Sequence, residues 1–97
     1  MEIKNATTAL AALGQTTRLA VFRLLVEAGP SGRVAGEIAE ALALPGATLS
    51  FHLKELSRAG LVSSRQDGRF VIYAADYRAM DALVAFLTEN CCTEGGC

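Results

Sequence analysis

Apolar residues recur at intervals of three and four positions along most of the chain, and this period predicts amphipathic helices. The stretches that carry it are residues 3–13, 17–28, 34–42, 47–59 and 77–90. Gly14 follows the first stretch and Gly60 follows the fourth, as glycines do at helix ends. Thr16 or Thr17 can cap the second helix, and Asp76 can cap the last. We therefore expect about five helices.

The period changes to two between residues 61 and 75, where β-prone residues flank the pair Asp67-Gly68. Asp-Gly is a strong signal for a hairpin, because a type I′ turn needs positive φ at both central positions. With that pair as the loop, Val62 lies opposite Tyr73. A helix, a tight turn, a second helix and then a hairpin form a winged helix-turn-helix, in which the hairpin is the wing. The order predicts a mainly α, winged helix-turn-helix fold with one two-stranded hairpin.

The chain has 97 residues, which is enough for one domain, and 52% of them are hydrophobic. That fraction exceeds what the core of a small monomer needs. The surplus lies on stripes of the first and last helices: Ile3, Leu10, Leu13, Met80, Leu83 and Leu87. We expect two chains to pair through these helices as a homodimer. The alternative is a compact, alanine-rich monomer.

The chain starts without a basic region, an apolar core and a cleavage site, and no stretch approaches the roughly 20 apolar residues of a membrane span. We therefore expect a cytoplasmic protein. Thiols stay reduced in that compartment, so the cysteines are more often ligands or reactive groups than disulfide partners. Their odd number, three, agrees with this interpretation.

The net charge of −1 hides an uneven distribution. Residues 47–75 are predominantly basic, whereas residues 76–97 are predominantly acidic. A basic segment within a helix-turn-helix pattern indicates a local surface for nucleic acid, although the whole chain is slightly acidic.

A helical wheel of residues 47–59 separates an inward leucine stripe from a face that carries Phe51, Lys54 and Arg58. A solvent face has little use for a phenylalanine, but in a major groove it can contact a thymine methyl group, while lysine and arginine meet phosphates or guanine. The bland alternative is a solvated face with one stray aromatic residue. We predict the following DNA-binding residues, including two wing arginines: Ala47, Thr48, Ser50, Phe51, Lys54, Arg58, Arg65 and Arg69.

Nothing in the sequence indicates an enzyme. His52 is the only histidine, and it lies nearer the inward stripe than the outward face, where a hydrogen-bonded core histidine is more common than a metal ligand. A cysteine enzyme would need an activating base or an anion-binding loop, and we find no glycine-rich loop of that kind.

One long segment resembles a known family. Residues 49–75 read LSFHLKELSRAGLVSSRQDGRFVIYAA, and residues 13–25 read LGQTTRLAVFRLL. Both are similar to the ArsR/SmtB family of metal- and arsenic-responsive repressors, over residues 5–90 in all. Gln15-Thr16 replaces the usual Asp-Pro of that family. The resemblance implies a winged-helix homodimer that binds an inverted-repeat operator and is released by an inducer.

The family has several inducer sites, and this chain lacks two of them. One arsenic site uses cysteines in the third helix, where this chain has Val34, Gly36 and Ala39. Zinc sites use aspartate and histidine on the last helix, which has no histidine here. What is left resembles the arsenic-responsive subgroup with C-terminal cysteines, here Cys91, Cys92 and Cys97. We therefore divide the chain into a DNA-binding and dimerisation domain, residues 1–90, and a cysteine-containing tail, residues 91–97.

The chemistry of the three thiols agrees with that subgroup. Thiolates select soft ions, and structural zinc wants four ligands whereas one tail offers three. Trivalent arsenic or antimony takes three thiolates. Neighbouring cysteines on a helix diverge by about 100°, so the chain must leave the helix near Asn90 for Cys91 and Cys92 to chelate. The expected inducer is arsenite or methylarsenite, with antimonite as a further candidate. The alternatives are a redox-sensing repressor or a sensor of cadmium, lead or zinc.

Overall fold

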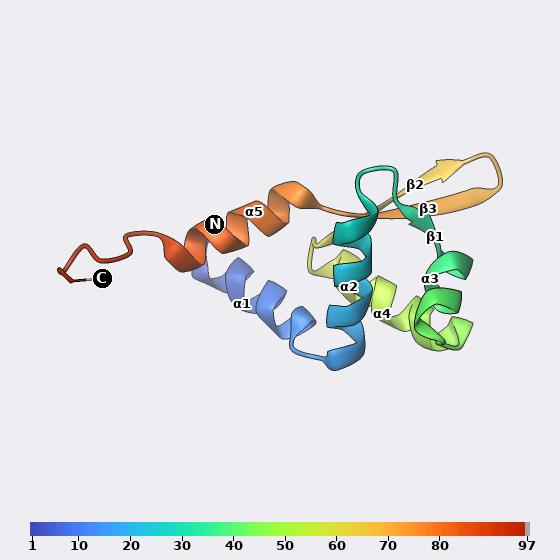
Figure 1. Ribbon diagram of the computed structural model, residues 1–97, viewed down its shortest axis with the longest axis horizontal. Coiled ribbons are helices and arrows are strands. Elements are labelled where there is room, and N and C mark those ends of the chain that lie inside the picture. The colour runs from blue at the N-terminus through green and yellow to red at the C-terminus, as the bar shows by residue number, and fades with distance from the viewer. Residues whose placement is uncertain (97) are drawn as a thin grey trace.

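The computed structural model describes residues 1–96 and contains five helices and three strands within them. In chain order these are α1 (Ile3–Leu13), α2 (Thr16–Ala28), β1 (Arg33–Val34), α3 (Ala35–Leu42), α4 (Gly46–Arg58), β2 (Val62–Asp67), β3 (Phe70–Ala75) and α5 (Tyr77–Thr88). Figure 1 shows α2, α3 and α4 grouped around the base of the hairpin, and α1 beside α5, which runs away from the hairpin. The predicted mainly α, winged helix-turn-helix fold is confirmed.

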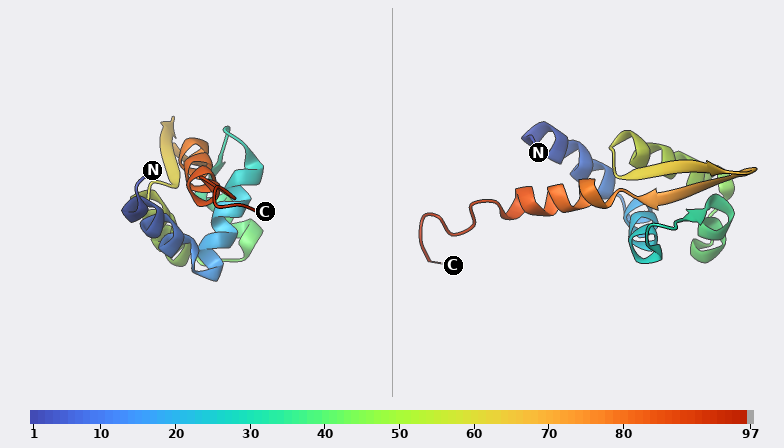
Figure 2. Two further views of the ribbon diagram at one scale, coloured as in Figure 1. Left: turned by 90° about the vertical axis from the view of Figure 1, so that its left-hand side faces the viewer. Right: turned by 90° about the horizontal axis from the view of Figure 1, so that it is seen from above.

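The molecule is elongated, with principal extents of 53 × 24 × 21 Å. The hairpin of β2 and β3 projects at one end of the long axis, while α5 and the chain's C-terminal segment extend toward the other (Figures 1 and 2). The predicted wing and the cysteine tail therefore lie at opposite ends of the protein, and any influence of one on the other must pass through the helices between them.

The core lies where α2, α3, α4 and the base of the wing meet. Leu49, Leu53 and Leu56 point inward from α4, as the wheel predicted, and all three are buried. α1 contributes small side chains instead, Ala6 and Ala9, which let it pack closely. Burying a leucine side chain is worth roughly 1.5–3 kcal/mol, so this stripe fixes how α4 sits on the body.

The helix ends agree with the predictions in two places and differ in one. Asp76 caps α5, because its carboxylate accepts a hydrogen bond from the Ala79 amide at 3.0 Å. Gly60 follows α4 with φ of 77°, the left-handed conformation that ends many helices. The threonine cap of α2 is wrong: Thr16 is already helical, and the side chain of Gln15 accepts from the Arg18 amide at 2.7 Å instead.

The sheet has a third strand that the sequence did not predict. β1 pairs with β3, Arg33 opposite Tyr73 and Val34 opposite Ile72, which gives the strand order β1-β3-β2. We had assigned Val34 to the start of the third helix, which begins one residue later. A strand of two residues is too short to show an alternating pattern, so only its partner strand reveals it.

The hairpin turns one residue later than predicted. Asp67 pairs with Phe70, which leaves Gly68-Arg69 as the two-residue loop, and Val62 lies opposite Ala75 rather than Tyr73. Gly68 has φ of 61°, whereas Arg69 is not among the residues of positive φ. A type II′ turn needs positive φ only at its first position, so glycine there decides the register. Because each partner moves by two positions, the predicted inward and outward faces are unchanged.

The predicted dimerisation stripe divides into three groups, of which Leu13 and Met80 form the half-buried one, packed against the core. Ile3, Leu10 and Leu87 are exposed, whereas Leu83 is buried in the core of the single chain. Val84, which the stripe did not include, is 57% exposed beside Leu87 on α5. Exposed apolar side chains thus gather on α1 and α5, as expected of helices that meet a partner.

No single helix within residues 1–96 is long and apolar enough to cross a membrane. α1 and α2 pass that test only when taken together, and they are bent by 101° at the break between them.

Candidate nucleic-acid interface and cysteine tail

The outward face of α4 presents every residue that the wheel assigned to it. The six helix positions are exposed: Ala47, Thr48, Ser50, Phe51, Lys54 and Arg58. Phe51 is 54% exposed, and its ring and the His52 ring form a T-shaped pair at a centroid distance of 5.5 Å. The leucine stripe holds α4 by its opposite side, so this mixed polar, apolar and basic face is free to enter a groove.

The charges of this face are not all equally available. Arg58 pairs with Glu55 one turn earlier, at 3.4 Å between Nη1 and Oε1. This pair is exposed on the arginine side and contributes little to stability, so DNA phosphate can compete for the guanidinium. Lys54 forms no ion pair within residues 1–96, and its ammonium group is the more available charge.

The two wing arginines have different surroundings. Arg69 occupies the hairpin loop, and within the described chain its guanidinium has neither an ion pair nor a hydrogen bond. Arg65 lies on β2 and donates to the backbone carbonyls of Pro30 at 3.2 Å and Ser31 at 2.9 Å. It therefore fastens the wing to the connection between α2 and β1, a role that the sequence did not indicate.

The wing tip also carries apolar side chains that we did not assign to DNA. Phe70 is 58% exposed and Val71 is 39% exposed. As neighbours on a strand they point to opposite faces of the hairpin, so the tip is apolar on both sides of the Arg69 loop. The signal was in the sequence, because two consecutive apolar residues beside the turn interrupt the alternation.

His52 is part of the core rather than of a site. It is 7% exposed, and its Nδ1 atom has no hydrogen-bond partner within residues 1–96. We had expected a hydrogen-bonded core histidine. The predicted burial is confirmed, but Nδ1 does not form the expected hydrogen bond within residues 1–96. α4 also lies away from the C-terminal end of α5 (Figure 1).

The cysteine pair lies directly after the end of α5. The helix ends at Thr88, and Asn90 and Cys92 both have left-handed backbone, with φ of 59° and 64°. Leaving the helix turns the two neighbouring side chains toward each other, and the Sγ atoms of Cys91 and Cys92 are 3.3 Å apart. The predicted condition for chelation by adjacent cysteines is therefore met.

Consecutive turns continue from Asn90 to Gly95. The Thr93 amide donates to the Asn90 carbonyl at 3.2 Å, and the Gly95 amide donates to the Cys92 carbonyl at 3.0 Å. Both cysteines of the pair are exposed, and Cys92 is disulfide-bonded in this structure. Cys97 lies outside the described residues. Residues 1–96 alone place no group of three or more His, Cys, Asp or Glu side chains around a common metal position.

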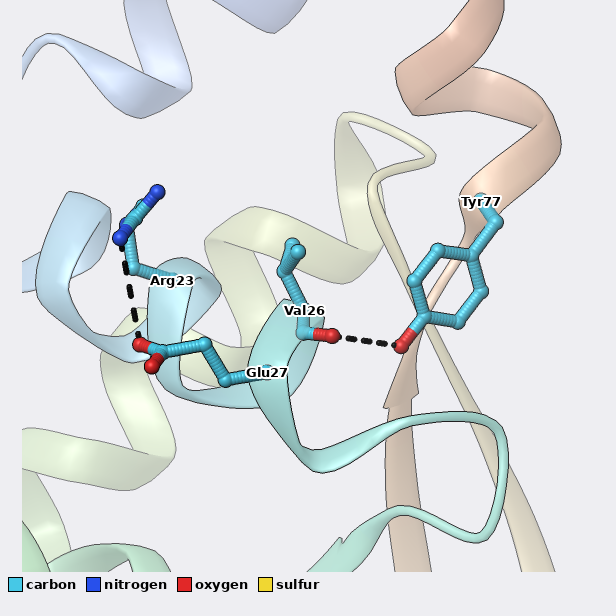
Figure 3. A network of polar contacts seen from close by, with 4 residues as sticks. All are labelled: Arg23, Val26, Glu27 and Tyr77. Carbon is cyan, nitrogen blue, oxygen red and sulfur yellow. Dashed lines mark hydrogen bonds and ion pairs between the residues drawn. The ribbon is translucent and has the colours of Figure 1, made fainter.

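The opposite end of α5 is anchored to the body. The Tyr77 hydroxyl donates to the carbonyls of Val26 at 2.9 Å and Leu25 at 3.2 Å, in the last turn of α2. Figure 3 shows the Tyr77 ring reaching from α5 to Val26 of α2. Beside this contact lies the Arg23–Glu27 ion pair of α2, whose charged atoms are 4.0 Å apart. α5 thus begins at a contact with α2 and ends at Thr88, three residues before Cys91.

An open groove of about 560 Å³ lies between α2 and α3, and its walls contain arginine, glutamate and aliphatic residues but no cysteine, histidine or hydroxyl group. It offers no nucleophile next to a base.

Comparison with known proteins agrees with the geometry. The family described as helix-turn-helix domain matches residues 13–65. The HTH-type transcriptional regulator YgaV of Escherichia coli K12 is 28% identical over 89 residues, which cover 92% of this chain and 88% of that protein. The uncharacterised HTH-type transcriptional regulator MJ1325 of Methanocaldococcus jannaschii is 37% identical over 62 residues, 64% of this chain and 67% of that protein.

Solved structures extend the likeness. An ArsR-like transcriptional regulator from Rhodococcus sp. RHA1 superposes with a TM-score of 0.78 at 26% identity, covering 88% of this chain and 77% of the other. A possible transcriptional regulator for arsenical resistance gives a TM-score of 0.70 at 29% identity, with 81% and 79% covered. The homodimeric winged helix-turn-helix domain of Mb0332 from Mycobacterium bovis superposes with a TM-score of 0.71 at 26% identity. The match covers 91% of this chain and 82% of the other.

Proposed function

Because this chain belongs to the helix-turn-helix domain family and is a DNA-binding transcriptional regulator of the ArsR family, we propose that it is a repressor released from its operator by trivalent arsenic. Its relatives are transcriptional regulators rather than enzymes. The observation that carries the arsenic assignment is the 3.3 Å separation of the Cys91 and Cys92 sulfur atoms just beyond the end of α5.

DNA binding is assigned to α4 and the wing. The outward face of α4 enters the major groove, where Phe51 contacts a thymine methyl group and Lys54 contacts phosphate or guanine. Arg69 at the hairpin loop meets the backbone or the minor groove next to that site. The exposure of these side chains and the local excess of basic residues support this arrangement.

The regulator acts as a homodimer on an inverted repeat. The exposed apolar side chains Ile3, Leu10, Val84 and Leu87 supply the surface between the two copies. The similar domain of Mb0332 is described as homodimeric, which supports the same assembly here. Two-fold pairing places one α4 on each half-site, so the dimer geometry sets the half-site spacing.

The inducer binds at Cys91 and Cys92, with Cys97 as the third ligand. Inorganic arsenite or antimonite takes three thiolates, whereas methylarsenite has one position filled by carbon and takes two. Thiolates are the ligands that such soft ions prefer. The Cys92 disulfide has to be reduced before that sulfur can ligate.

Release follows from linkage between the two binding events. An inducer that weakens DNA binding must itself bind the DNA-free dimer more tightly, by the same factor. Nearly complete switching needs a preference of about 5.5 kcal/mol. Several metalloid–thiolate bonds at the end of α5 can supply that difference if they change the position of this helix.

The test is operator binding under reducing conditions, titrated with arsenite, antimonite, methylarsenite, cadmium and zinc. The operator is first selected from random DNA by the inducer-free protein. Arsenite and antimonite should release the DNA at lower concentration than cadmium or zinc, and Cys91→Ser should lose the response while keeping operator affinity. If the variant still responds to arsenite, the tail is not the sensor.

A redox-sensing repressor is the second candidate, and the Cys92 disulfide is the observation that favours it. Such a protein would release DNA when treated with peroxide and regain it with a dithiol, and it would ignore arsenite in the reduced state. The same operator assay with peroxide in place of arsenite separates the two functions.

A further inference from the structure

One side chain of the wing and one side chain of α5 both donate hydrogen bonds to the same short piece of backbone. We call residues 25–32, the last turn of α2 and the loop to β1, the junction. Tyr77 of α5 donates to the carbonyls of Leu25 and Val26 at one side of it. Arg65 of the wing donates to the carbonyls of Pro30 and Ser31 at the other side. These partners lie between 34 and 52 positions apart in the sequence.

The Tyr77 contact satisfies groups that the helix itself leaves open. The last four carbonyls of a helix have no partner within it, and for α2 these belong to residues 25–28. Gly29 ends α2 with φ of 84° and supplies no capping hydrogen bond. The phenol hydroxyl therefore replaces part of a missing cap, and it comes from the first residue of α5, the helix that precedes the cysteines (Figure 3).

The junction is also held against the central strand of the sheet. Gly32 has φ of 70°, and a Cβ atom added there would lie 2.4 Å from the Tyr73 carbonyl oxygen of β3. The next residue, Arg33, pairs with Tyr73 in the sheet. The backbone of the junction and the wing are thus in direct contact, and packed backbone of this kind shifts as a unit rather than deforming.

We propose that Tyr77 is a positioning residue that couples the position of α5 to the angle of the wing, and that Arg65 completes this coupling at the wing. While α5 is in its inducer-free position, the two side chains hold the junction and keep the wing at the angle that DNA requires. Metalloid binding at the far end of α5 tilts the helix and withdraws the Tyr77 hydroxyl. The stimulus in this inference rests on the proposed release by arsenic.

α5 could also be coupled to the wing directly through the chain that connects β3 to α5. β3 leads into α5 through Asp76, whose amide donates to the Leu61 carbonyl at 2.8 Å. That connection is the same in wild-type protein and in Tyr77→Phe, which lacks only the hydroxyl. The variant therefore separates coupling through the junction from coupling through the β3–α5 connection.

The first experiment needs no inducer. Operator affinity is measured for Tyr77→Phe, for Arg65→Lys, which keeps the charge but loses the forked donor geometry, and for the double variant. Residues this far apart with no shared partner normally contribute additively. We expect each single change to weaken operator binding about three- to tenfold and the double variant to bind no worse than the weaker single variant. Additive losses, or wild-type affinity of Tyr77→Phe, would overturn the coupling.

The matched control is Tyr73→Phe, which removes a hydroxyl with no hydrogen bond to residues 1–96. It should bind the operator as wild type does. Thermal unfolding of each variant identifies any that is misfolded at the assay temperature. In that case the affinities are compared at a lower temperature, where all variants are folded.

The second experiment adds arsenite and compares the operator dissociation constants with and without it. We take the ratio of the dissociation constant with arsenite to the constant without it. A purely structural defect changes both constants by the same factor and leaves this ratio unchanged, whereas a coupling defect lowers it. We expect the ratio to fall about tenfold in Tyr77→Phe, which corresponds to about 1.4 kcal/mol. The variant should still protect its tail thiols from a thiol reagent when arsenite is present, unlike Cys91→Ser. An unchanged ratio overturns the role of Tyr77. If wild type ignores arsenite, the proposed inducer is wrong, and the inducer-free comparison alone decides the coupling.

Discussion

The salt dependence of operator binding is the sharpest test of how the wing meets DNA. Arg69 lies in the hairpin loop without a partner in the described chain, whereas two donors of Arg65 are engaged by the carbonyls of Pro30 and Ser31. Both arginines were predicted to bind DNA. We expect Arg69→Ala to weaken binding and flatten its salt dependence, and Arg65→Ala to weaken binding with a smaller change of slope.

The magnitude follows from counterion release. Each phosphate contact adds about 0.9 to the slope of log affinity against log salt concentration. A dimer has two wings, so Arg69→Ala should lower the slope by about 1.8. Between 50 and 200 mM salt, a fourfold change, wild type should then lose roughly 12-fold more affinity than the variant does. The variant's defect is largest at low salt and shrinks as salt is added.

The assay is fluorescence anisotropy of a labelled operator at four or more salt concentrations, with wild type and both variants measured on the same DNA. Lys54→Ala serves as a positive control for a phosphate contact from α4. If Arg69→Ala and Arg65→Ala both keep the wild-type slope, the wing does not contact the phosphates and its assignment to the DNA interface is wrong.

Four further expectations test other parts of the molecule. Phe51→Ala should change the preferred operator sequence, and equal losses on specific and random DNA would exclude a thymine contact. Cys97→Ser should weaken release by arsenite but largely spare release by methylarsenite, and this division of ligands is wrong if Cys97→Ser harms both as much as Cys91→Ser. Gly32→Ala should lower the free energy of unfolding by at least about 2 kcal/mol, because of its positive φ and the blocked Cβ position, and denaturant titration would show otherwise if the junction can relax. Leu87→Glu should produce monomers at micromolar concentration in sedimentation, and a persistent dimer would place the interface elsewhere.

Much of the fold was determined by the sequence itself, because its signals are local. The period of three to four residues predicted all five helices, and the buried stripe of α4, Leu49, Leu53 and Leu56, follows from that period. Asp76 caps the start of α5, and Gly60 adopts the left-handed conformation just after α4. Both effects lie within one turn of the helix concerned. The exposed face with Phe51 follows from the same wheel.

The cysteine pair depends partly on the sequence and partly on the folded structure. Its composition and its place after the last helix are sequence properties, but whether Cys91 and Cys92 face each other depends on where the helix ends. The helix ends at Thr88, and the left-handed backbone of Cys92 accompanies the 3.3 Å approach of the two sulfur atoms.

Only the tertiary structure decided the contacts between distant segments. β1 is a strand because its two residues pair with the edge of β3. The hairpin register depends on whether Asp67 pairs with Phe70 or belongs to the loop. The partners of Arg65 and Tyr77 are backbone carbonyls, which every residue has, so no side-chain pattern announces them. Hydrogen bonds across 34 and 51 positions exist only after the chain has folded, because only the packed core brings the junction, the wing and α5 within reach of one another.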